Sequence, residues 1–337
     1  MSEVVSEQEE KELFVRAYSA MVLGRTLDKK IMTAQRQGRV GFYVPSMGQE
    51  ATQAGLGMAL RPEDRVFQYY RDITLMIYRG VDIDIILNQI FGNARDLAKG
   101  RQMPSHLMAT EGNFFSVPSP VGTNLPLAVG SAYARRYRKL PGIVAATFGD
   151  GASSTPDFHA AMNFASVYNL PVLFVCENNR WAISLPYEKQ SKVEVWKKAE
   201  AYGMPGAKVD GNDFIRTYRV CREAVEYVRS GRGPYLVEAV SYRMGPHSTS
   251  DDPSKYRDNA IEEGSDQDPL VIAEKSLIAL GYITKEKSEK LWEEAKKLVD
   301  SRFEELEKVP APEPRTLFDD VYKEMTWNLK EEMEEIL

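Results

Sequence analysis

Two polar side chains stand at the ends of two apolar segments in the centre of the chain. Asp150 lies within a Gly-Asp-Gly turn after the apolar segment 143–148, and Asn179, 29 positions after Asp150, follows the apolar segment 171–176. Parallel neighbouring strands need a crossover of a dozen or more residues, so this offset suits two adjacent strands of a parallel sheet. Their carboxyl ends would lie about 5 Å apart, and both side chains could then face one small ligand.

That ligand is predicted to be a magnesium ion that holds a diphosphate. Mg²⁺ prefers octahedral oxygen coordination, usually from one or two protein groups together with phosphate and water. The carboxylate of Asp150, the side-chain amide of Asn179 and the backbone carbonyl of Trp181 can supply oxygens. A helix that begins near Thr155 would turn its N-terminus, which favours anions, toward the same edge.

Further residues around these strands could contact the same ligand. Gly149 and Gly151 are expected to permit backbone conformations and a close approach that a side chain would forbid. Tyr70 and Arg71 end the short strand predicted over 65–70. The planar fork of an arginine can clamp phosphate oxygens, although an arginine after a strand is more often part of a surface ion pair.

The elements that must position these residues indicate an α/β fold with a parallel sheet and helices on both faces. Ser6 and Glu9 form a capping box for a long amphipathic helix that ends near Gly38. The strands predicted in the sheet all end in polar loops, as a doubly wound sheet requires; they cover 65–70, 143–148, 171–176 and 235–240. The predicted parts of what is overall one large domain are an N-terminal helical extension, a cofactor-binding α/β domain, and a C-terminal helical region with a tail, over 1–48, 49–262 and 263–337.

Composition excludes several classes of protein. The chain has 337 residues, of which 43% are apolar and 27% charged, as in soluble globular proteins. A net charge of -6 gives no basic footprint for nucleic acid, and no run of eighteen apolar residues predicts a membrane span. With only two cysteines and an acidic N-terminal segment unlike a secretory or mitochondrial signal, the expected location is the cytoplasm.

Two irregular segments are expected to line the site. The segment 100–123 has no clear period, and ordered loops of this length are often functional. It contains His106, for which a structural or surface role is as good an interpretation as a functional one. Ser119 and Val121 precede a helix predicted to begin near Asn124, where backbone groups could address a ligand. The polar segment after the last strand contains His247.

Gly149-Asp150-Gly151, taken together with Asn178-Asn179, resembles the thiamine diphosphate motif of transketolase-like enzymes, which starts with Gly-Asp-Gly and ends with Asn-Asn. Over nearly its whole length the chain resembles the alpha subunits of the thiamine-dependent decarboxylase component of 2-oxo acid dehydrogenase complexes. The branched-chain type is the most similar in appearance. The runs that carry the resemblance are GRQMPSH at 100–106, RMGPHSTSDD at 243–252 and LFDDVY at 317–322.

The resemblance implies a role for each candidate residue. Asp150, Asn179 and Trp181 would bind Mg²⁺, and His247 would contact the diphosphate and face the reactive thiazolium carbon, where an imidazole can stabilise or protonate intermediates. Ser119 and Val121 would meet the aminopyrimidine through backbone groups. The implied thiamine diphosphate contacts are Tyr70, Arg71, Ser119, Val121, Gly149, Asp150, Gly151, Ala152, Asn179, Trp181 and His247.

Some residues depart from the family pattern or have a different expected role. Glu177 stands where some branched-chain relatives carry a basic residue, which puts part of the phosphate contact in doubt. Ser248 matches a serine that kinases modify in mitochondrial relatives, but here we expect it to hydrogen-bond within its loop. His159 is expected to be packed rather than catalytic. The glutamate that activates thiamine in this family belongs to a beta subunit, so the chain should carry half of an active site.

The resemblance therefore implies an α2β2 enzyme that decarboxylates branched-chain 2-oxo acids and passes the acyl group to a lipoyl arm of the transacylase core. Pyruvate or acetoin as the substrate is the nearest alternative. A non-catalytic assembly subunit with a recruiting acidic tail is an alternative of another class, and a magnesium-dependent nucleotide enzyme would need a GxxxxGK[ST] loop, which the sequence lacks. The sequence leaves open a potassium site near 119–123, order in the His247 loop without cofactor, and phosphorylation of Ser248.

Overall fold

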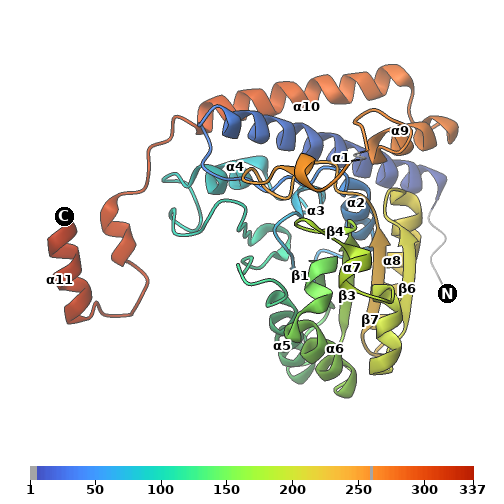
Figure 1. Cartoon of the computed structure of the whole chain (residues 1–337), viewed down its shortest axis with the longest axis horizontal. Helices are drawn as coiled ribbons and strands as arrows, with labels where there is room; N and C mark the ends of the chain where they lie inside the picture. The colour runs from blue at the N-terminus through green and yellow to red at the C-terminus, as the bar shows by residue number, and fades with distance from the viewer. Residues whose placement is uncertain (1–5, 259–260) are drawn as a thin grey trace.

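A computed structural model describes residues 6–258 and 261–337. Its centre is a five-stranded parallel sheet with helices on both faces, which confirms the predicted α/β class (Figure 1). The strand order is β1-β2-β3-β7-β6. The bounds of these strands are β1 (Arg65–Phe67), β2 (Val144–Gly149), β3 (Val172–Asn178), β7 (Tyr235–Val240) and β6 (Gly206–Asp210).

The side chains of β3 show how the sheet is buried on both sides. Val172, Phe174 and Cys176 join the apolar cluster beneath α5 (Asn124–Tyr137) and α6 (Pro156–Val167). Leu173 and Val175 point to the opposite face, where α8 (Phe214–Arg229) and α2 (Glu50–Ala59) pack. This alternation follows from the two-residue period of a strand, and burial on both faces explains why the strand is continuously apolar.

Further helices cover the α2 side of the sheet. Ser6 and Glu9 form the predicted capping box. The long helices α1 and α10 lie side by side across this layer (Figure 1). Their bounds, and those of the shorter helices of this region, are α1 (Glu7–Arg36), α3 (Ile73–Tyr78), α4 (Ile83–Phe91), α9 (Pro269–Ala279) and α10 (Lys285–Leu306).

The structure differs from the sequence predictions in several elements. Edge strand β6 was not predicted; of its five residues only Val209 is buried, so it lacks the apolar run of the central strands. β1 ends at Phe67, before the predicted end at residue 70. A small antiparallel pair, β4 (Trp181–Ala182) with β5 (Leu185–Pro186), follows β3, and a 3-10 helix covers Val195–Tyr202.

The C-terminal tail leaves the body of the molecule. Its last helix, α11 (Trp327–Ile336), contains no buried residue and stands apart in Figure 1. The linker before it is tied to the 94–101 loop, where Ala94 N donates to Pro310 O at 2.8 Å and Lys99 pairs with Asp320 at 2.6 Å. Within 6–258 and 261–337, no helix is long and apolar enough to cross a membrane. The three-part division of the chain stays a prediction.

Candidate functional site

A cavity of about 550 Å³ lies at the carboxyl edge of the sheet. It is lined by the end of β2, the residues that follow β1 and β3, the 100–123 segment and the loop after β7, as expected for the ligand edge of a parallel sheet. Every residue that the sequence put forward for cofactor contact lines it: Tyr70, Arg71, Ser119, Val121, Gly149, Asp150, Gly151, Ala152, Asn179, Trp181 and His247.

Asp150 is the acidic group at the floor of the cavity. It directly follows β2, it is 1% exposed, and its Oδ2 accepts a 2.6 Å hydrogen bond from Gln190 Nε2. Burial raises the pKa of Asp150 to about 6, because a carboxylate loses hydration there and gains only one side-chain donor. A bound cation would compensate this buried charge.

Asn179 and Trp181 supply further oxygens beside Asp150. Asn179 is buried after β3; its Nδ2 donates to Gln49 Oε1 at 3.1 Å, and its Oδ1 accepts from Trp181 N at 3.2 Å. The Trp181 carbonyl accepts from Arg243 Nη1 at 3.2 Å, which leaves one lone pair. In the described part of the chain, no group of three or more His, Cys, Asp or Glu side chains could hold a metal. One carboxylate with an amide and a carbonyl suits Mg²⁺ that shares phosphate oxygens.

Arg71 forms the basic wall of the cavity and is not a surface ion pair. It is 1% exposed; Nη1 donates to Pro45 O at 2.6 Å, and Nη2 lies 2.9 Å from both His247 O and His247 Nδ1. The Nε atoms of Arg71 and of nearby Arg243 are buried without a hydrogen-bond partner in the described structure. Buried guanidinium groups with spare donors fit an anionic group such as a diphosphate.

His247 is held as a neutral imidazole. Burial, together with the charges of Arg71 and Arg243, lowers the pKa of His247 to about 3. Since an arginine only donates, His247 Nδ1 must accept, and the ring proton sits on Nε2. The backbone N of His247 donates to Asp251 Oδ2 at 2.7 Å, which fixes the loop at this residue. The imidazole therefore offers one N–H donor in the cavity wall.

A second histidine, which the sequence left undecided, also lines the cavity. His106 Nε2 lies 2.7 Å from Ser119 Oγ. The pair joins the two ends of the irregular segment that forms the opposite wall, which confirms that this segment lines the site. Their separation of thirteen positions in a stretch without a period gave no signal for this contact.

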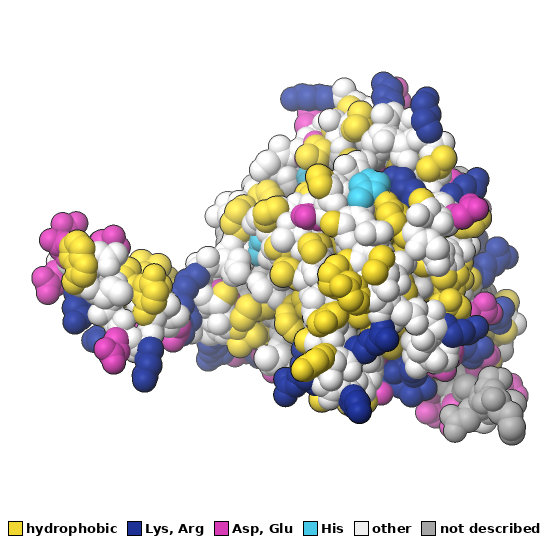
Figure 2. Space-filling model, turned by 90° about the horizontal axis from the view of Figure 1, so that it is seen from below, with side chains coloured by type: hydrophobic (Ala, Val, Ile, Leu, Met, Phe, Trp, Pro, Cys, Tyr) yellow, Lys and Arg dark blue, Asp and Glu magenta, His cyan; other side chains and the backbone are white. Residues whose placement is uncertain are grey.

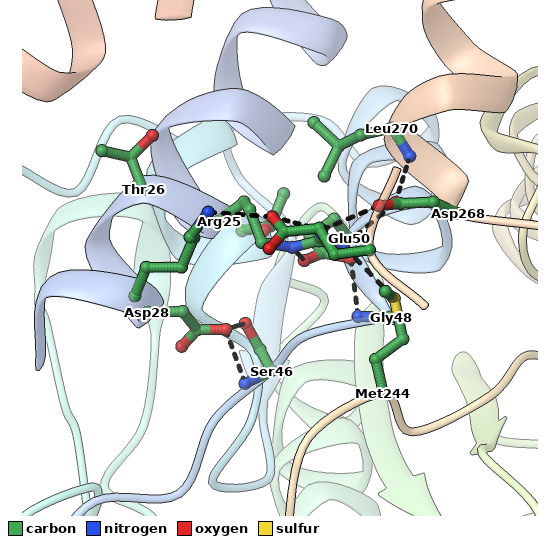
Figure 3. Close-up of polar contacts among 12 residues, drawn as sticks. Arg25, Thr26, Asp28, Ser46, Gly48, Glu50, Met244, Asp268 and Leu270 are labelled. Carbon is green, nitrogen blue, oxygen red and sulfur yellow. Dashed lines mark hydrogen bonds and ion pairs between the residues drawn. The ribbon is translucent and has the colours of Figure 1, made fainter. Parts of the chain in front are cut away.

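The loop that carries His247 is anchored by a buried ion cluster (Figure 3). Arg25 of α1 is fully buried; its Nε donates to Glu50 Oε1 at 2.6 Å, and its Nη1 and Nη2 donate to Asp268 at 3.1 and 3.2 Å. Arg25 Nη2 also lies 3.6 Å from the sulfur of Met244, and Met244 N donates to Met47 O at 3.1 Å. The cluster thereby joins α1, α2 and the loop after β7.

The same cluster region holds the chain between α1 and α2. Asp28 accepts from Ser46 N and Ser46 Oγ, both at 2.8 Å (Figure 3). It also accepts from the hydroxyl of Tyr43. Thr249 N donates to Tyr43 O at 2.9 Å. Since Pro45 O binds Arg71, this connecting chain positions both the arginine and the histidine loop.

Glu177 makes no contact with the cavity. It is fully buried on the other side of β3, where its Oε2 accepts from Gln53 Nε2 at 3.2 Å and lies 3.1 Å from Tyr69 Oη. Tyr69 Oη also lies 2.8 Å from Gln49 Oε1 and has only one proton to donate. Burial raises the pKa of Glu177, and burial beside Glu177 raises the pKa of Asp72 well above its usual value, so this pair retains a proton.

Three smaller predictions can now be compared with the structure. Neither Gly149 nor Gly151 has a positive φ, so the expectation of a special backbone conformation was wrong, because Gly149 ends a regular strand and a 3-10 turn follows it. His159 is exposed and pairs with the hydroxyl of Tyr202, so it is not packed as expected. Ser248 Oγ accepts from Ser250 N at 3.3 Å, which confirms its role within the loop.

Comparison with known proteins agrees with this geometry. The family model described as the dehydrogenase E1 component matches residues 18–315. The 2-oxoisovalerate dehydrogenase alpha subunit of Bacillus subtilis is 39% identical over 312 residues, which cover 91% of this chain and 94% of that protein. The human mitochondrial 2-oxoisovalerate dehydrogenase alpha subunit is 38% identical over 330 residues, which cover 97% of this chain and 74% of that protein. The chain therefore belongs to the dehydrogenase E1 component family.

Proposed function

We propose that this chain is the alpha subunit of a thiamine diphosphate-dependent dehydrogenase that decarboxylates branched-chain 2-oxo acids. The observation that carries the proposal is the convergence of Asp150, Asn179, Trp181, Arg71 and His247 on one cavity. The similarity to 2-oxoisovalerate dehydrogenase alpha subunits from a bacterium and from animals supports the substrate class.

The residues of the cavity fit thiamine diphosphate with Mg²⁺. Asp150, Asn179 and the Trp181 carbonyl would hold the metal, and Arg71 would neutralise the diphosphate, since its buried Nε has no partner in the described structure. When bound, thiamine diphosphate supplies the carbon nucleophile and the electron sink for decarboxylation. The irregular segment with Ser119 and Val121 would bind the opposite end of the cofactor.

His247 would be the group in the cavity wall that donates and accepts a proton. Its Nε2 carries the proton, and its Nδ1 is fixed by Arg71, so the ring can donate at one defined atom. The negative charge of a diphosphate beside Arg71 would offset the arginine and raise the pKa of His247 toward neutrality, where an imidazole both gives and takes a proton.

A beta subunit is proposed as the partner that completes the site. Among the described residues that line the cavity there is no glutamate, whereas the family resemblance requires one at the aminopyrimidine. We propose the α2β2 assembly and a lipoyl-bearing transacylase core as acceptor of the acyl group. A potassium site near 119–123 and a cytoplasmic location stay predictions.

The test is to reconstitute the chain with its beta subunit and compare turnover of 2-oxoisovalerate and pyruvate. We expect a higher kcat/KM for 2-oxoisovalerate, and magnesium-dependent binding of thiamine diphosphate by calorimetry. Asp150→Ala should lose both the turnover of 2-oxoisovalerate and the magnesium-dependent binding of thiamine diphosphate. Preference for pyruvate would overturn the substrate class, and cofactor binding that survives in Asp150→Ala would overturn the assignment of the metal site.

A further inference from the structure

Each of the two side chains assigned to the metal is hydrogen-bonded to a glutamine. Gln190 Nε2 donates to Asp150 Oδ2 at 2.6 Å, and Asn179 Nδ2 donates to Gln49 Oε1 at 3.1 Å. Gln190 is the last residue of the short helix α7 (Tyr187–Gln190), and Gln49 directly precedes α2. Neither glutamine is among the described residues that line the cavity. They therefore contact the metal-binding groups rather than the contents of the cavity.

Gln49 controls which atom of the Asn179 amide can face a cation. A side-chain amide has an oxygen that can bind a cation and a nitrogen that only donates. Gln49 accepts from the nitrogen, and the oxygen accepts from Trp181 N at 3.2 Å through one of its two lone pairs. The second lone pair of Asn179 Oδ1 is then available to a metal. If the amide turned over, its nitrogen would face the metal, and one of the metal ligands would be lost.

The local structure of Gln49 indicates that its side chain serves Asn179 rather than its own helix. It occupies the N-cap of α2 but makes no side-chain cap hydrogen bond there. It is fully buried, and its Nε2 has no hydrogen-bond partner in the described structure. Its Oε1 lies 2.8 Å from Tyr69 Oη as well as 3.1 Å from Asn179 Nδ2. A buried donor without a partner costs stability, so a purely structural explanation of this orientation is insufficient.

Gln190 determines which oxygen of Asp150 remains for a cation. Its hydrogen bond occupies Oδ2, so a metal would bind through Oδ1. Mg²⁺ requires a near-ideal octahedron, which a carboxylate joins more readily with one oxygen than with two. The helix that carries Gln190 is fixed by Tyr187, whose N donates to Arg180 O at 2.9 Å and whose hydroxyl donates to Val193 O at 2.6 Å. The donor is therefore held at a defined place.

Both glutamines act without adding charge. Figure 2 shows Lys, Arg, Asp and Glu side chains mainly around the rim of the body and on the tail that stands apart from it. α2 and α7 lie in the body (Figure 1), where Gln49 is fully buried and Gln190 is half-buried. A neutral amide can fix the orientation of a metal ligand without repelling the cation or competing for it. Replacing either glutamine by methionine therefore removes a hydrogen bond and leaves the net charge unchanged.

We propose that Gln49 and Gln190 are positioning residues of the metal site, Gln49 as a hydrogen-bond acceptor and Gln190 as a donor. This inference rests on the proposed function and adds to it how the ligand atoms are oriented. Residues that hold metal ligands commonly contribute about 10- to 100-fold to metal affinity. Loss of either glutamine should therefore raise the Mg²⁺ concentration that the site needs, while saturating Mg²⁺ should restore the binding of thiamine diphosphate.

The test measures the Mg²⁺ concentration that gives half-maximal binding of thiamine diphosphate to the chain purified with its beta subunit. Gln49→Met and Gln190→Met should each raise this concentration at least about tenfold in titration calorimetry. Gln49→Glu keeps an oxygen acceptor beside Asn179 and should need no more Mg²⁺ than the unchanged chain. At saturating Mg²⁺, all three variants should bind thiamine diphosphate with nearly unchanged affinity.

Two control variants separate positioning from a general loss of structure. Gln89→Met removes another buried glutamine, whose Nε2 donates to Met108 O at 2.9 Å. Lys189→Met changes the exposed neighbour of Gln190 on α7. Both should need as much Mg²⁺ as the unchanged chain. Circular dichroism checks that each variant is folded, and the half-buried Gln190 provides the test should Gln49→Met unfold.

The outcomes distinguish this inference from the proposed function. An unchanged Mg²⁺ requirement in Gln49→Met and Gln190→Met overturns the inference and leaves the proposed function standing. Weak binding that saturating Mg²⁺ does not restore also overturns it, as does a Gln49→Glu variant that binds no better than Gln49→Met, because both results indicate a merely structural role. If the unchanged chain with its beta subunit binds no thiamine diphosphate at any Mg²⁺ concentration, the proposed function itself is wrong.

Discussion

The floor and the wall of the cavity are held in place by different means. The floor consists of Asp150 and Asn179, which follow two adjacent strands whose register places Gly149 beside Glu177. The wall consists of Arg71 and the His247 loop, which depend on contacts with α1, α2 and the chain that connects them. One short stretch of sequence therefore makes the floor, whereas the wall needs segments that lie far apart in the chain.

The floor is positioned by backbone geometry, whereas the wall is positioned by buried charged side chains. The ladder between β2 and β3 aligns the floor through regular backbone hydrogen bonds. The wall relies on Arg25, which binds Glu50 and Asp268 away from water (Figure 3). A buried ion cluster adds little net stability, but it is sensitive to the loss of one member, because the remaining charges are left uncompensated. The two regions should consequently respond differently to substitution.

The largest effect is expected from Arg25→Met. It leaves Glu50 and Asp268 buried without their cation, and such a loss costs about 3 to 5 kcal/mol. Urea unfolding measures the change in the free energy of unfolding, and amide exchange at Met244 reports whether the His247 loop loosens. Arg39→Met is the matched control, since it removes a partly exposed pair with Glu307 and should cost less than about 1 kcal/mol. Equal losses in the two variants would contradict the role of burial.

A gain in stability is expected from Asp150→Asn in the floor when cofactor is absent. Folding raises the pKa of Asp150 from 3.8 to about 6, so between these values the folded chain binds more protons than the unfolded one. Stability therefore falls as pH rises through this window, and the full cost, at most about 3 kcal/mol, is present above pH 6. Asparagine carries no charge and avoids that cost.

The measurement for Asp150→Asn is thermal unfolding at pH 4 and pH 8, with and without Mg²⁺ and thiamine diphosphate. Without ligands, the melting temperature of the variant should exceed that of the unchanged chain at pH 8. At pH 4 the two melting temperatures should differ little. With ligands only the unchanged chain should gain stability, because the variant binds Mg²⁺ at least about tenfold more weakly. A variant that is less stable at pH 8 would contradict the cost of the buried carboxylate.

The wall can be tested through the pKa of His247. Burial and the positive charges of Arg71 and Arg243 lower this pKa to about 3, so Arg243→Met, which removes one of the charges, should raise it toward 6.5. Proton NMR of the imidazole measures it, and the exposed Arg180→Met serves as control. The pKa of His247 is lower in the folded chain than in the unfolded chain, so His247 lowers the stability of the fold as pH falls below 6.5. The loss of stability at low pH should therefore be smaller in Arg243→Met than in the unchanged chain. An unchanged pKa would show that burial and Arg71 set it without Arg243.

The sequence predicted the floor well because its signals are local. The apolar runs of β2 and β3 and the polar residue after each are readable within a few positions, and Ser6 with Glu9 marks the start of α1 in the same way. Strand β6 escaped prediction, since an edge strand with one buried side chain has no apolar run. Local patterns thus predict elements that are buried on both sides and miss those at the edge.

The wall could be predicted only through family resemblance. The resemblance pointed to Arg71 and His247, but no spacing rule links either residue to Pro45, Arg25 or Arg243, which hold or tune them. Contacts such as Arg25 with Asp268 span more than two hundred positions, and a charge in an amphipathic helix gives no sign of its partner. Residues that line the cavity are therefore easier to foresee than the residues that position them.

The smallest effect on stability is expected from alanine substitutions at Gly149 and Gly151, which flank Asp150. These variants test whether the glycines are required for folding or for ligand binding. A Cβ on Gly149 would meet nothing closer than the Tyr69 ring at 3.7 Å, whereas a Cβ on Gly151 would lie 3.0 Å from Ala182 Cβ. Gly149→Ala should change the free energy of unfolding by less than about 1 kcal/mol, with a gain from lower chain entropy in the unfolded state. Calorimetry with thiamine diphosphate and Mg²⁺ should nevertheless show weaker binding by Gly149→Ala if the diphosphate approaches the backbone there. Equal affinity in Gly149→Ala and the unchanged chain would mean that this glycine serves neither the fold nor the ligand.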